Sequence, residues 1–410
     1  MKKFSGYATL TVTVLLLGCM LLITIASHQH TLFQLKRYKN QEVARQQAWL
    51  AEGGLECFYA QARDLEAMPA SIHDCGAQQS PSIVVSSVGG NEYQVTASSG
   101  YQHVSRNLVI GGSGSGVLQA NSSLYFHSAF TVSTPDPGNL ASDGWQCTSI
   151  TYSGDLVLNS TFNNQGVIHG LAPSSQFNSQ GKDCASDHRT INSSNYQKDI
   201  RQAKNMEPFE SFFGVKASQH NSIRDGGEFT VLTGSGTPKI LADCGSTIAD
   251  SIKAGSTRIW VEGGCEITSE QYNALVDASH DTTNGVLLLL HDGPVSLMGA
   301  PAENASSNKF KGALMVFHHN YEPKLSDWEN MKAGHFLSHA TSDFPIAVRQ
   351  QAGFYQHGSF FFTGGMFIDM ASLQALFYTS LNLSYNQDVI NSVFNPFSKP
   401  VWKAGSWRDF

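Results

Sequence analysis

The sequence predicts an α+β protein that is mostly β, with one long N-terminal helix followed by a β-rich body. Two observations lead to this prediction. No charged residue occurs from Tyr7 to Ala26, a run about long enough to cross a bilayer as one helix. Beyond Ser82 the chain consists of short β-prone runs separated by Asn, Gly and Ser, which is the pattern of strands joined by turns.

The apolar helix is expected to continue beyond the membrane as an amphipathic rod. Leu32 to Leu55 contains no proline and no glycine before Gly53. Charged and apolar residues are interleaved along this stretch, as in a helix with one apolar side. We therefore expect one helix over residues 7–56, preceded by a short basic leader over residues 1–6.

A conventional signal peptide is the alternative interpretation of the N-terminus. Such a peptide has a basic start, a short apolar centre and a small-residue cleavage site. Here Ile25-Ala26-Ser27 offers a weak site of that kind. The apolar run is longer than a usual signal core, and this length favours a retained helix.

The composition indicates an exported, weakly charged protein. Charged residues make up 14% of the 410 residues, and glycine is abundant at 37, which suits an extracellular β-rich fold. The net charge is −7 and the body contains no Lys/Arg run, so the sequence does not indicate nucleic acid as a partner. A hydrophobic content of 41% is enough for a packed core.

Six of the seven cysteines lie outside the apolar run, an even number that fits disulfides formed in an oxidising compartment. Cysteine counts do not determine connectivity, but proximity in the chain favours sequential pairs. The favoured pairs are Cys57 with Cys75, Cys147 with Cys184, and Cys244 with Cys265. The seventh, Cys19, lies in the apolar helix, and the absence of Cys-x-x-Cys disfavours zinc.

Residues 57–110 are predicted to form a small β head. The helix is expected to end before Pro69, and turn residues divide Ser82 to Ile110 into β-prone runs of an antiparallel sheet. The Gly/Ser segment 111–116 follows as a flexible link. It lacks the Lys-Ser/Thr of a phosphate loop, so we expect no nucleotide site there.

Residues 117–410 are predicted to form a large β-rich body. Two of its runs are alike, Asn284–His291 and Lys311–His318, because in each a glycine opens an apolar strand that closes on a histidine. Stacked short strands of this kind favour a β-solenoid, and a β-sandwich is the competing fold. Helical insertions are expected at 195–207, 269–278 and 386–393.

We find no constellation typical of catalysis and expect a non-enzymatic protein without a cofactor or a bound metal. The hydrolase motif Gly-x-Ser-x-Gly is absent. His318 and His319 with His335 and His339 form the densest histidine cluster, but Phe336 stands where a metalloprotease needs glutamate. We expect these histidines to be ordinary surface or strand residues.

Aromatic residues crowd the C-terminal quarter, and alternation along strands predicts that they pack in the core. They include Phe354, Tyr355, Phe360 to Phe362, Phe367, Phe377 and Tyr378. Trp402 and Trp407 are expected to seal the last turn of the body, because a solenoid end otherwise exposes a strand edge.

Three segments carry a family resemblance. Lys-Lys-Phe-Ser-Gly followed by Tyr-Ala-Thr-Leu resembles a type IV prepilin leader. The stretch Gln47–Glu56 resembles the alanine- and glutamate-rich end of the helix in PilX-type minor pilins, and Gly405–Phe410 resembles the ending of the same group. The resemblance covers roughly the first sixty residues and the very C-terminus, and the middle resembles the group only in general style.

The resemblance implies a processing step and a set of partners. A prepilin peptidase would cut between Gly6 and Tyr7, and Tyr7 would become N-methylated. The helix would stay in the inner membrane before assembly and then join other minor pilins and the major pilin in an extracellular pilus. The implied roles are to initiate assembly and to mediate adhesion to a surface or aggregation with another cell. DNA uptake is an analogy without support in these residues.

One position departs from the pattern of major pilins. Their fifth mature residue is a glutamate, whereas this chain has Thr11. A carboxylate in a bilayer is costly unless it is paired, and a subunit with nothing above it does not need one. K-type pseudopilins of type II secretion systems share this absence. Thr11 therefore favours a place at the filament tip, and such a pseudopilin or a membrane-anchored binding protein unrelated to pili remains the alternative.

Overall fold

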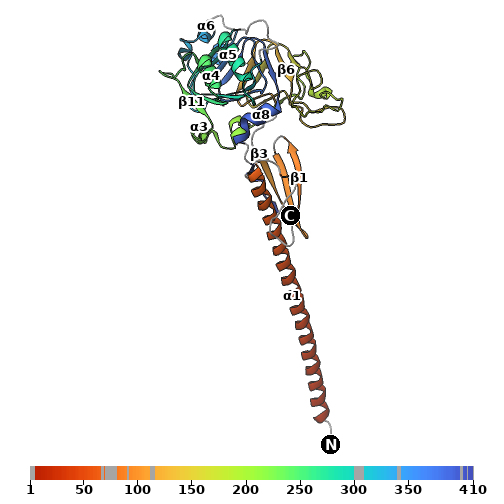
Figure 1. Cartoon of the computed structure of the whole chain (residues 1–410). Coiled ribbons are helices and arrows are strands. Elements are labelled where there is room, and N and C mark those ends of the chain that lie inside the picture. The colour runs from red at the N-terminus through yellow and green to blue at the C-terminus, as the bar shows by residue number, and fades with distance from the viewer. Residues whose placement is uncertain are drawn as a thin grey trace. The chain divides into compact units, whose positions relative to one another are not determined.

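The computed structural model describes residues 5–65, 69, 81–89, 92–110, 116–299, 309–338, 343–397, 400–403 and 405–409. The chain forms two compact units (Figure 1). One comprises Met1–Ser87, Tyr93–Leu108 and Trp402–Phe410, and the other comprises Val88–Glu92 and Val109–Val401. A long helix followed by a strand-rich body with helices makes the protein α+β, as predicted.

Helix α1 covers Ser5–Leu65 and is longer than the expected 7–56. It ends before Pro69, in agreement with the constraint that proline places on the residues before it. From Ala51 onward one side of α1 is buried, at Ala51, Leu55, Phe58 and Ala62. This spacing of three and four residues places the four side chains on a single helix face.

The first unit also contains a five-stranded sheet. Strands β1 (Ser82–Gly89), β2 (Glu92–Ser99), β3 (Gln102–Ile110) and β22 (Pro400–Trp402) follow one another in the sheet. Strand β23 (Arg408–Asp409) pairs antiparallel with β3 through Arg408 opposite Ser105. Sequence reasoning did not anticipate that the C-terminus completes this sheet.

Three sheets form the second unit, and every pairing between their strands is parallel. The eight-stranded sheet has the order β10-β7-β4-β19-β16-β14-β12-β11, the six-stranded sheet β13-β15-β17-β20-β5-β8, and the four-stranded sheet β18-β21-β6-β9. The strands are β4 Leu118–Ala120, β5 Ser123–Phe126, β6 Phe130–Thr134, β7 Ile150–Tyr152, β8 Leu156–Leu158, β9 Phe162–Asn164, β10 Ile200–Gln202, β11 Thr230–Thr233, β12 Arg258–Glu262, β13 Cys265–Thr268, β14 Val286–His291, β15 Val295–Met298, β16 Gly312–Phe317, β17 Ala352–His357, β18 Phe361–Phe362, β19 Met366–Asp369, β20 Gln374–Phe377 and β21 Leu381–Ser384.

The chain visits the three sheets in a repeated order. Strands β4, β5 and β6 lie in the eight-, six- and four-stranded sheets in turn, and so do β7, β8, β9 and β19, β20, β21. The chain enters this stack in its middle, because β4, β5 and β6 pair with β19, β20 and β21. Segments far apart in sequence, such as Ser123 and Gln374, therefore lie side by side.

The two similar runs noted in the sequence are neighbouring strands. In β14 and β16, Val286 lies opposite Gly312 and His291 opposite Phe317. Every residue of both strands is buried, as is typical of parallel strands covered on both faces. A sandwich is built from antiparallel sheets, so the parallel pairing in the described body does not fit that alternative.

Two of the three predicted helical insertions are confirmed. Helix α5 (Ser269–His280) begins at a capping box formed by Thr268 and Gln271, and α8 (Gln387–Phe394) is capped by Asn386. The prediction for 195–207 is wrong, because this segment contains β10, which pairs with β7. Tertiary pairing there outweighs the local helical pattern.

The remaining helices are short. They are α2 Pro208–Phe213, α3 His220–Arg224, α4 Cys244–Lys253, α6 Lys332–Ser338 and α7 Ile346–Arg349, with 3-10 turns η1 Ser186–His188, η2 Ala217–Gln219, η3 Leu325–Trp328 and η4 Asn395–Phe397. Elements η3, α6 and α7 cover part of the six-stranded sheet. They bury Trp328 and Leu337 against Met298, Tyr355 and Leu376, on the face opposite to the main core, since successive strand residues point to opposite faces.

Candidate functional site

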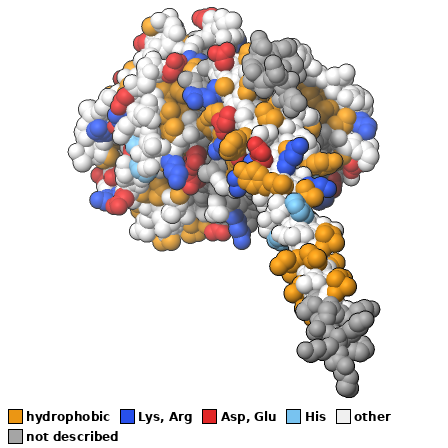
Figure 2. All heavy atoms as spheres, turned by 90° about the horizontal axis from the view of Figure 1, so that it is seen from below, with side chains coloured by type: hydrophobic (Ala, Val, Ile, Leu, Met, Phe, Trp, Pro, Cys, Tyr) orange, Lys and Arg blue, Asp and Glu red, His pale blue; other side chains and the backbone are white. Residues whose placement is uncertain are grey.

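The apolar half of α1 is the most distinctive surface of the first unit. Its large side chains are exposed on every side of the helix, with Leu10 at 63%, Leu17 at 68% and Ile23 at 68%. Figure 2 shows hydrophobic side chains along the described part of this helix. A helix that is apolar all round requires an apolar environment, which a bilayer or neighbouring helices supply. By length and composition α1 can cross a membrane.

Two hydroxyl groups within this apolar half form hydrogen bonds inside the helix. The hydroxyl of Thr13 donates to the Leu10 carbonyl at 2.9 Å, and that of Thr24 donates to the Leu21 carbonyl at 2.8 Å. Such bonds to a preceding turn remove the cost of an unpaired hydroxyl in lipid. Gly6 and Tyr7 lie in the first turns of α1, and Thr11 is exposed on it.

The C-terminal segment contacts α1 and β3 through a cluster around Arg106. The Arg106 guanidinium lies 4.9 Å from the ring centre of Trp402 and 5.8 Å from that of Trp407. Its Nη1 is 3.5 Å from Oε1 of Glu56 on α1. Tyr59 of α1 stacks on Trp402 with ring centres 5.0 Å apart. The cluster joins the helix, the sheet and the chain end within one unit.

Backbone bonds fix the same segment. The Lys403 N–H donates to the Asn107 carbonyl at 2.8 Å, and the Asn107 N–H donates to the Ser406 hydroxyl at 3.1 Å. The expectation that the two tryptophans seal the body is therefore wrong, because aromatic stacking and the Arg106 cation hold them in the first unit. Glu56 and Trp407, which belong to two of the segments that carry the family resemblance, both contact Arg106 here.

The described disulfides match two of the favoured pairs. Cys147 bonds to Cys184 across 37 residues, and Cys244 bonds to Cys265 across 21. Cys57 is also disulfide-bonded, while Cys75 lies outside the described residues. Cys19 is a free, exposed thiol on α1. Short cross-linked loops of this kind restrict the unfolded chain and favour the folded one.

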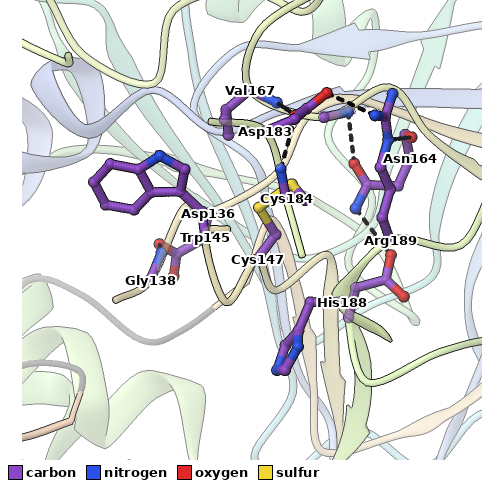
Figure 3. The surroundings of a disulfide bond; sticks show 12 residues. Asp136, Gly138, Trp145, Cys147, Asn164, Val167, Asp183, Cys184, His188 and Arg189 are labelled. Atoms are coloured by element: carbon purple, nitrogen blue, oxygen red, sulfur yellow. Dashed lines mark hydrogen bonds and ion pairs between the residues drawn. A yellow bond between two sulfur atoms is a disulfide. The ribbon is translucent and has the colours of Figure 1, made fainter. Parts of the chain in front are cut away.

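A network of charged groups surrounds the Cys147–Cys184 bond (Figure 3). Nη1 of Arg189 lies 2.6 Å from Oδ2 of Asp183, and its other nitrogens donate to the carbonyls of Asn164 and Gln165. The second oxygen of Asp183 accepts the backbone N–H groups of Val167 and Cys184, both at 2.8 Å. These bonds satisfy the Arg189 guanidinium and the Asp183 carboxylate. We therefore assign the network a role in stabilising the loops rather than in catalysis.

Asp199 provides a second buried anchor nearby. Its carboxylate is fully buried and accepts from Ser149, Asn164 and Thr190, with the Thr190 hydroxyl at 2.6 Å. A buried carboxylate is tolerated when several donors surround it. Its neighbours in sequence had suggested a helix, and the local pattern gave no sign of this role.

The histidines that lie together in the structure are not the ones that lie closest together in the sequence. His220, His291 and His319 come together, with ring centres 4.8 Å apart for His220–His291 and 5.4 Å for His220–His319. Burial lowers the pKa of His291 to about 4 and also lowers that of His318, so both are neutral at pH 7. His335 lies on α6, and His339 lies outside the described residues. Among the described side chains no group of His, Cys, Asp or Glu is arranged to hold a metal ion.

Most of the C-terminal aromatics pack in the core, as predicted. The rings of Phe354, Phe360, Phe367 and Phe377 are buried in the main cluster. Four other rings are only partly buried and line up across the six-stranded sheet, at His127, Phe336, His357 and Tyr378. Phe336 lies on α6 and His357 on β17, while His127 and Tyr378 directly follow β5 and β20. Because these segments are far apart in the chain, no local sequence pattern predicts the row.

Comparisons with protein-family models, with curated proteins and with solved structures found no match for this chain.

Proposed function

We propose that this protein is a minor pilin of the PilX-like group, placed at or near the tip of a type IV pilus. It would help to initiate assembly and mediate adhesion or aggregation. The observation that carries the proposal is an all-round apolar, exposed helix directly behind a basic leader that ends in Gly6. A leader cut at that glycine keeps the helix on the protein, where it serves first as an anchor and then as an assembly element.

Physical features of α1 support the assembly role. Its apolar half has partners only outside the described chain, and helices in lipid associate by close packing of such surfaces. One face of the segment from Ala51 to Ala62 is buried within the first unit. The helix therefore offers one half to other subunits and uses the other half to carry its globular domains.

We further propose that the body is a β-solenoid. The support is the repeated visiting order of the three parallel sheets and the in-register stacking of β12, β14 and β16. A stack of this kind provides a long, rigid lateral surface, which suits contact with a surface or another cell.

Mass measurement of the mature N-terminus tests the proposal directly. We expect a chain that begins with N-methylated Tyr7. Gly6→Ala should abolish the cut, whereas Gly18→Ala is the matched control, since nothing lies within 4 Å of a Cβ at position 18. A mature chain that starts at Met1 or after Ala26 would sink the pilin proposal and leave a membrane-anchored binding protein.

The tip position needs a separate test. Immunogold labelling should mark filament ends and leave the shaft unlabelled. Because Thr11 lacks a carboxylate, Thr11→Glu should allow incorporation along the shaft. Labelling of the whole shaft by the wild-type protein would contradict the tip position. Loss of protein secretion without loss of pili on deletion would favour the K-type pseudopilin instead.

A further inference from the structure

A polar cleft of about 610 Å³ lies in the second unit beside β13, the outermost strand of the six-stranded sheet. Its walls come from four parts of the chain: Glu266 and Thr268 belong to β13, Asp243 precedes α4, Glu270 belongs to α5, and Asn330 and Lys332 lie before and at the start of α6. The Cys244–Cys265 disulfide ties the α4 side of the cleft to β13. The cleft is therefore built on cross-linked, regular elements rather than on a loose loop.

Glu266 holds the opposite wall in place. Its carboxylate accepts the backbone N–H groups of Lys332 at 2.9 Å and Ala333 at 3.1 Å, and the Ser296 hydroxyl at 2.8 Å. These three bonds fasten α6 to the sheet. The Glu266 carboxylate is thus engaged structurally, and the exposed side chains of Asp243, Glu270 and Lys332 are the charged groups that face a ligand.

A second, apolar cleft of about 430 Å³ continues the first. The two share Thr268 and Lys332, and the second is lined by Met298, Phe336 and His357. Phe336 is 37% exposed, and its ring centre lies 4.3 Å from that of His357. Burial lowers the pKa of His357, so its ring is neutral at pH 7.

The aromatic surface extends from this apolar cleft across the sheet. Ring centres are 4.6 Å apart for His357–Tyr378 and 4.9 Å for the stacked pair His127–Tyr378. Strand register produces the row, because Thr268 lies opposite Met298 and Met298 lies opposite His357. Tyr378 and His127 directly follow Phe377 and Phe126, which are paired with each other. The rings of His357, Tyr378 and His127 lie at three neighbouring strands, β17, β20 and β5, or about 10 Å at the usual strand spacing, and Thr268 and Met298 continue the same line on β13 and β15.

From this geometry we infer that the clefts and the aromatic row form one binding site for a neutral oligosaccharide. Sugar rings have apolar C–H faces that pack on aromatic rings, and hydroxyl groups that need both donors and acceptors. Phe336 and His357 line the apolar cleft and offer the ring faces. Asp243 and Glu270 accept hydrogen bonds, and Lys332 and Asn330 donate them. The two adjoining clefts, which share Thr268 and Lys332, suit several linked sugar units rather than one.

The charged groups of the groove favour a neutral oligosaccharide over a polyanion such as single-stranded nucleic acid. A single-stranded nucleic acid also stacks on aromatic rings but requires a basic groove for its phosphates. Here the groove holds two exposed carboxylates against one lysine ammonium, so a polyanion is repelled. A role of this site in adhesion rests on the proposed function, whereas the binding itself does not.

Glycan binding by the full-length protein in detergent micelles tests the inference. The probes are neutral tetrasaccharides of hexose and N-acetylhexosamine units, with a sialylated tetrasaccharide and a single-stranded DNA oligomer as charged comparisons. We expect Phe336→Ala and the double change Asp243→Asn with Glu270→Gln each to weaken binding by tenfold or more. Tyr101→Ala is the matched control, because this tyrosine is 90% exposed in the other unit, and it should leave the affinity unchanged.

Folding is monitored in parallel by thermal unfolding, so that only variants with an unchanged transition are compared. The inference is overturned if no neutral tetrasaccharide binds at millimolar concentration. It is equally overturned if folded Phe336→Ala binds like the wild type, or if the sialylated sugar or the DNA binds more tightly than the neutral sugars. The mature N-terminus is measured in a separate experiment. A lack of glycan binding therefore does not contradict the pilin proposal, and an unprocessed N-terminus does not contradict glycan binding.

Discussion

Two apolar stretches of similar composition meet opposite environments in this molecule. In α1 the run around Leu15, Leu16 and Leu17 is exposed on all sides, whereas in β14 the run Leu287–Leu290 is buried completely. Both segments are rich in leucine and valine, and both lack charge. Hydrophobicity therefore does not distinguish the two segments. What distinguishes them is the presence or absence of packed strands around each one.

The difference shows where each segment finds its partners. Strand β14 has β12 on one side and β16 on the other, and both faces of the sheet are covered. Helix α1 satisfies its backbone internally, so that it can leave its side chains for lipid or for other helices. The apolar side chains of β14 are covered by the chain itself, while those of the apolar half of α1 are exposed.

The largest expected effect comes from truncating one leucine in each region. Leu289 is fully buried and lies opposite Trp260, so Leu289→Ala should lower the free energy of unfolding by about 2–5 kcal/mol. Leu17→Ala should change it by less than about 0.5 kcal/mol. Urea unfolding followed by tryptophan fluorescence measures both. Equal losses of unfolding free energy in the two variants would show that α1 belongs to the same cooperative core as β14. That result would contradict the difference drawn between the two segments.

A charge in the apolar half of α1 tests its need for lipid. Leu16→Lys should cost about 3 kcal/mol of membrane insertion, and the fraction retained in membranes after an alkaline wash should fall. The control is Val43→Lys, which lies beyond the uncharged run and is already 42% exposed. If both variants stay in the membrane fraction like the wild type, anchoring by this run is refuted.

Lowering the pH should reduce the stability of the body and leave the stability of the helix unchanged. Burial lowers the pKa of His291 to about 4, below its unfolded value near 6.5. Above pH 6.5 neither state binds the proton, and as the pH falls towards 4 the unfolded state binds it first, so stability falls. The loss from this residue between pH 7 and pH 5 is about 2 kcal/mol.

Asp369 opposes this trend, because burial raises its pKa and its contribution to stability is lost as the pH rises through the folded value. The change His291→Gln isolates the histidine, since it removes one titration and keeps a hydrogen-bonding side chain for the Phe317 carbonyl. The difference between the unfolding midpoints at pH 7 and pH 5 should become smaller in this variant without vanishing, because burial also lowers the pKa of His318 and of His357. Midpoints that differ as much as in the wild type would argue against the role of His291.

The smallest effect is expected where the helix turns from exposed to buried. Arg106→Ala removes the stacking on Trp402 and Trp407 and should cost about 1 kcal/mol. Arg106→Lys keeps the charge but lacks the planar group, so it should recover only part of this loss. Limited proteolysis of the C-terminal segment reports the change. Unaltered cleavage in Arg106→Ala would mean that the backbone bonds alone hold the segment.

Local signals predicted elements well where their cause is local. The cap at Thr268 and the apolar spacing after it were sufficient for α5, and the glycine-led apolar runs were sufficient for β14 and β16. The segment 195–207 failed because Ile200 pairs with Ile150, a contact that no nearby residue signals.

The features of the candidate sites also fall into two groups, those that nearby residues predict and those that depend on distant pairing. The long apolar helix and two of the cysteine pairs could be predicted from the sequence, because each depends on a composition or on a short separation. The row from His357 through Tyr378 to His127 was not, because it depends on strand register between residues far apart in the chain. The tryptophans at the C-terminus were assigned to the wrong unit for the same reason.

By itself the sequence determined that a long apolar helix precedes a strand-rich body, since backbone propensity and hydrophobic period are properties of neighbouring residues. Only the tertiary structure decided that β4 pairs with β19, that the C-terminus returns to β3 and that aromatic rings line up across one sheet. The physical reason is that pairing of distant strands depends on packing of the whole core, which closes loops of many residues and leaves no mark on any short stretch of chain.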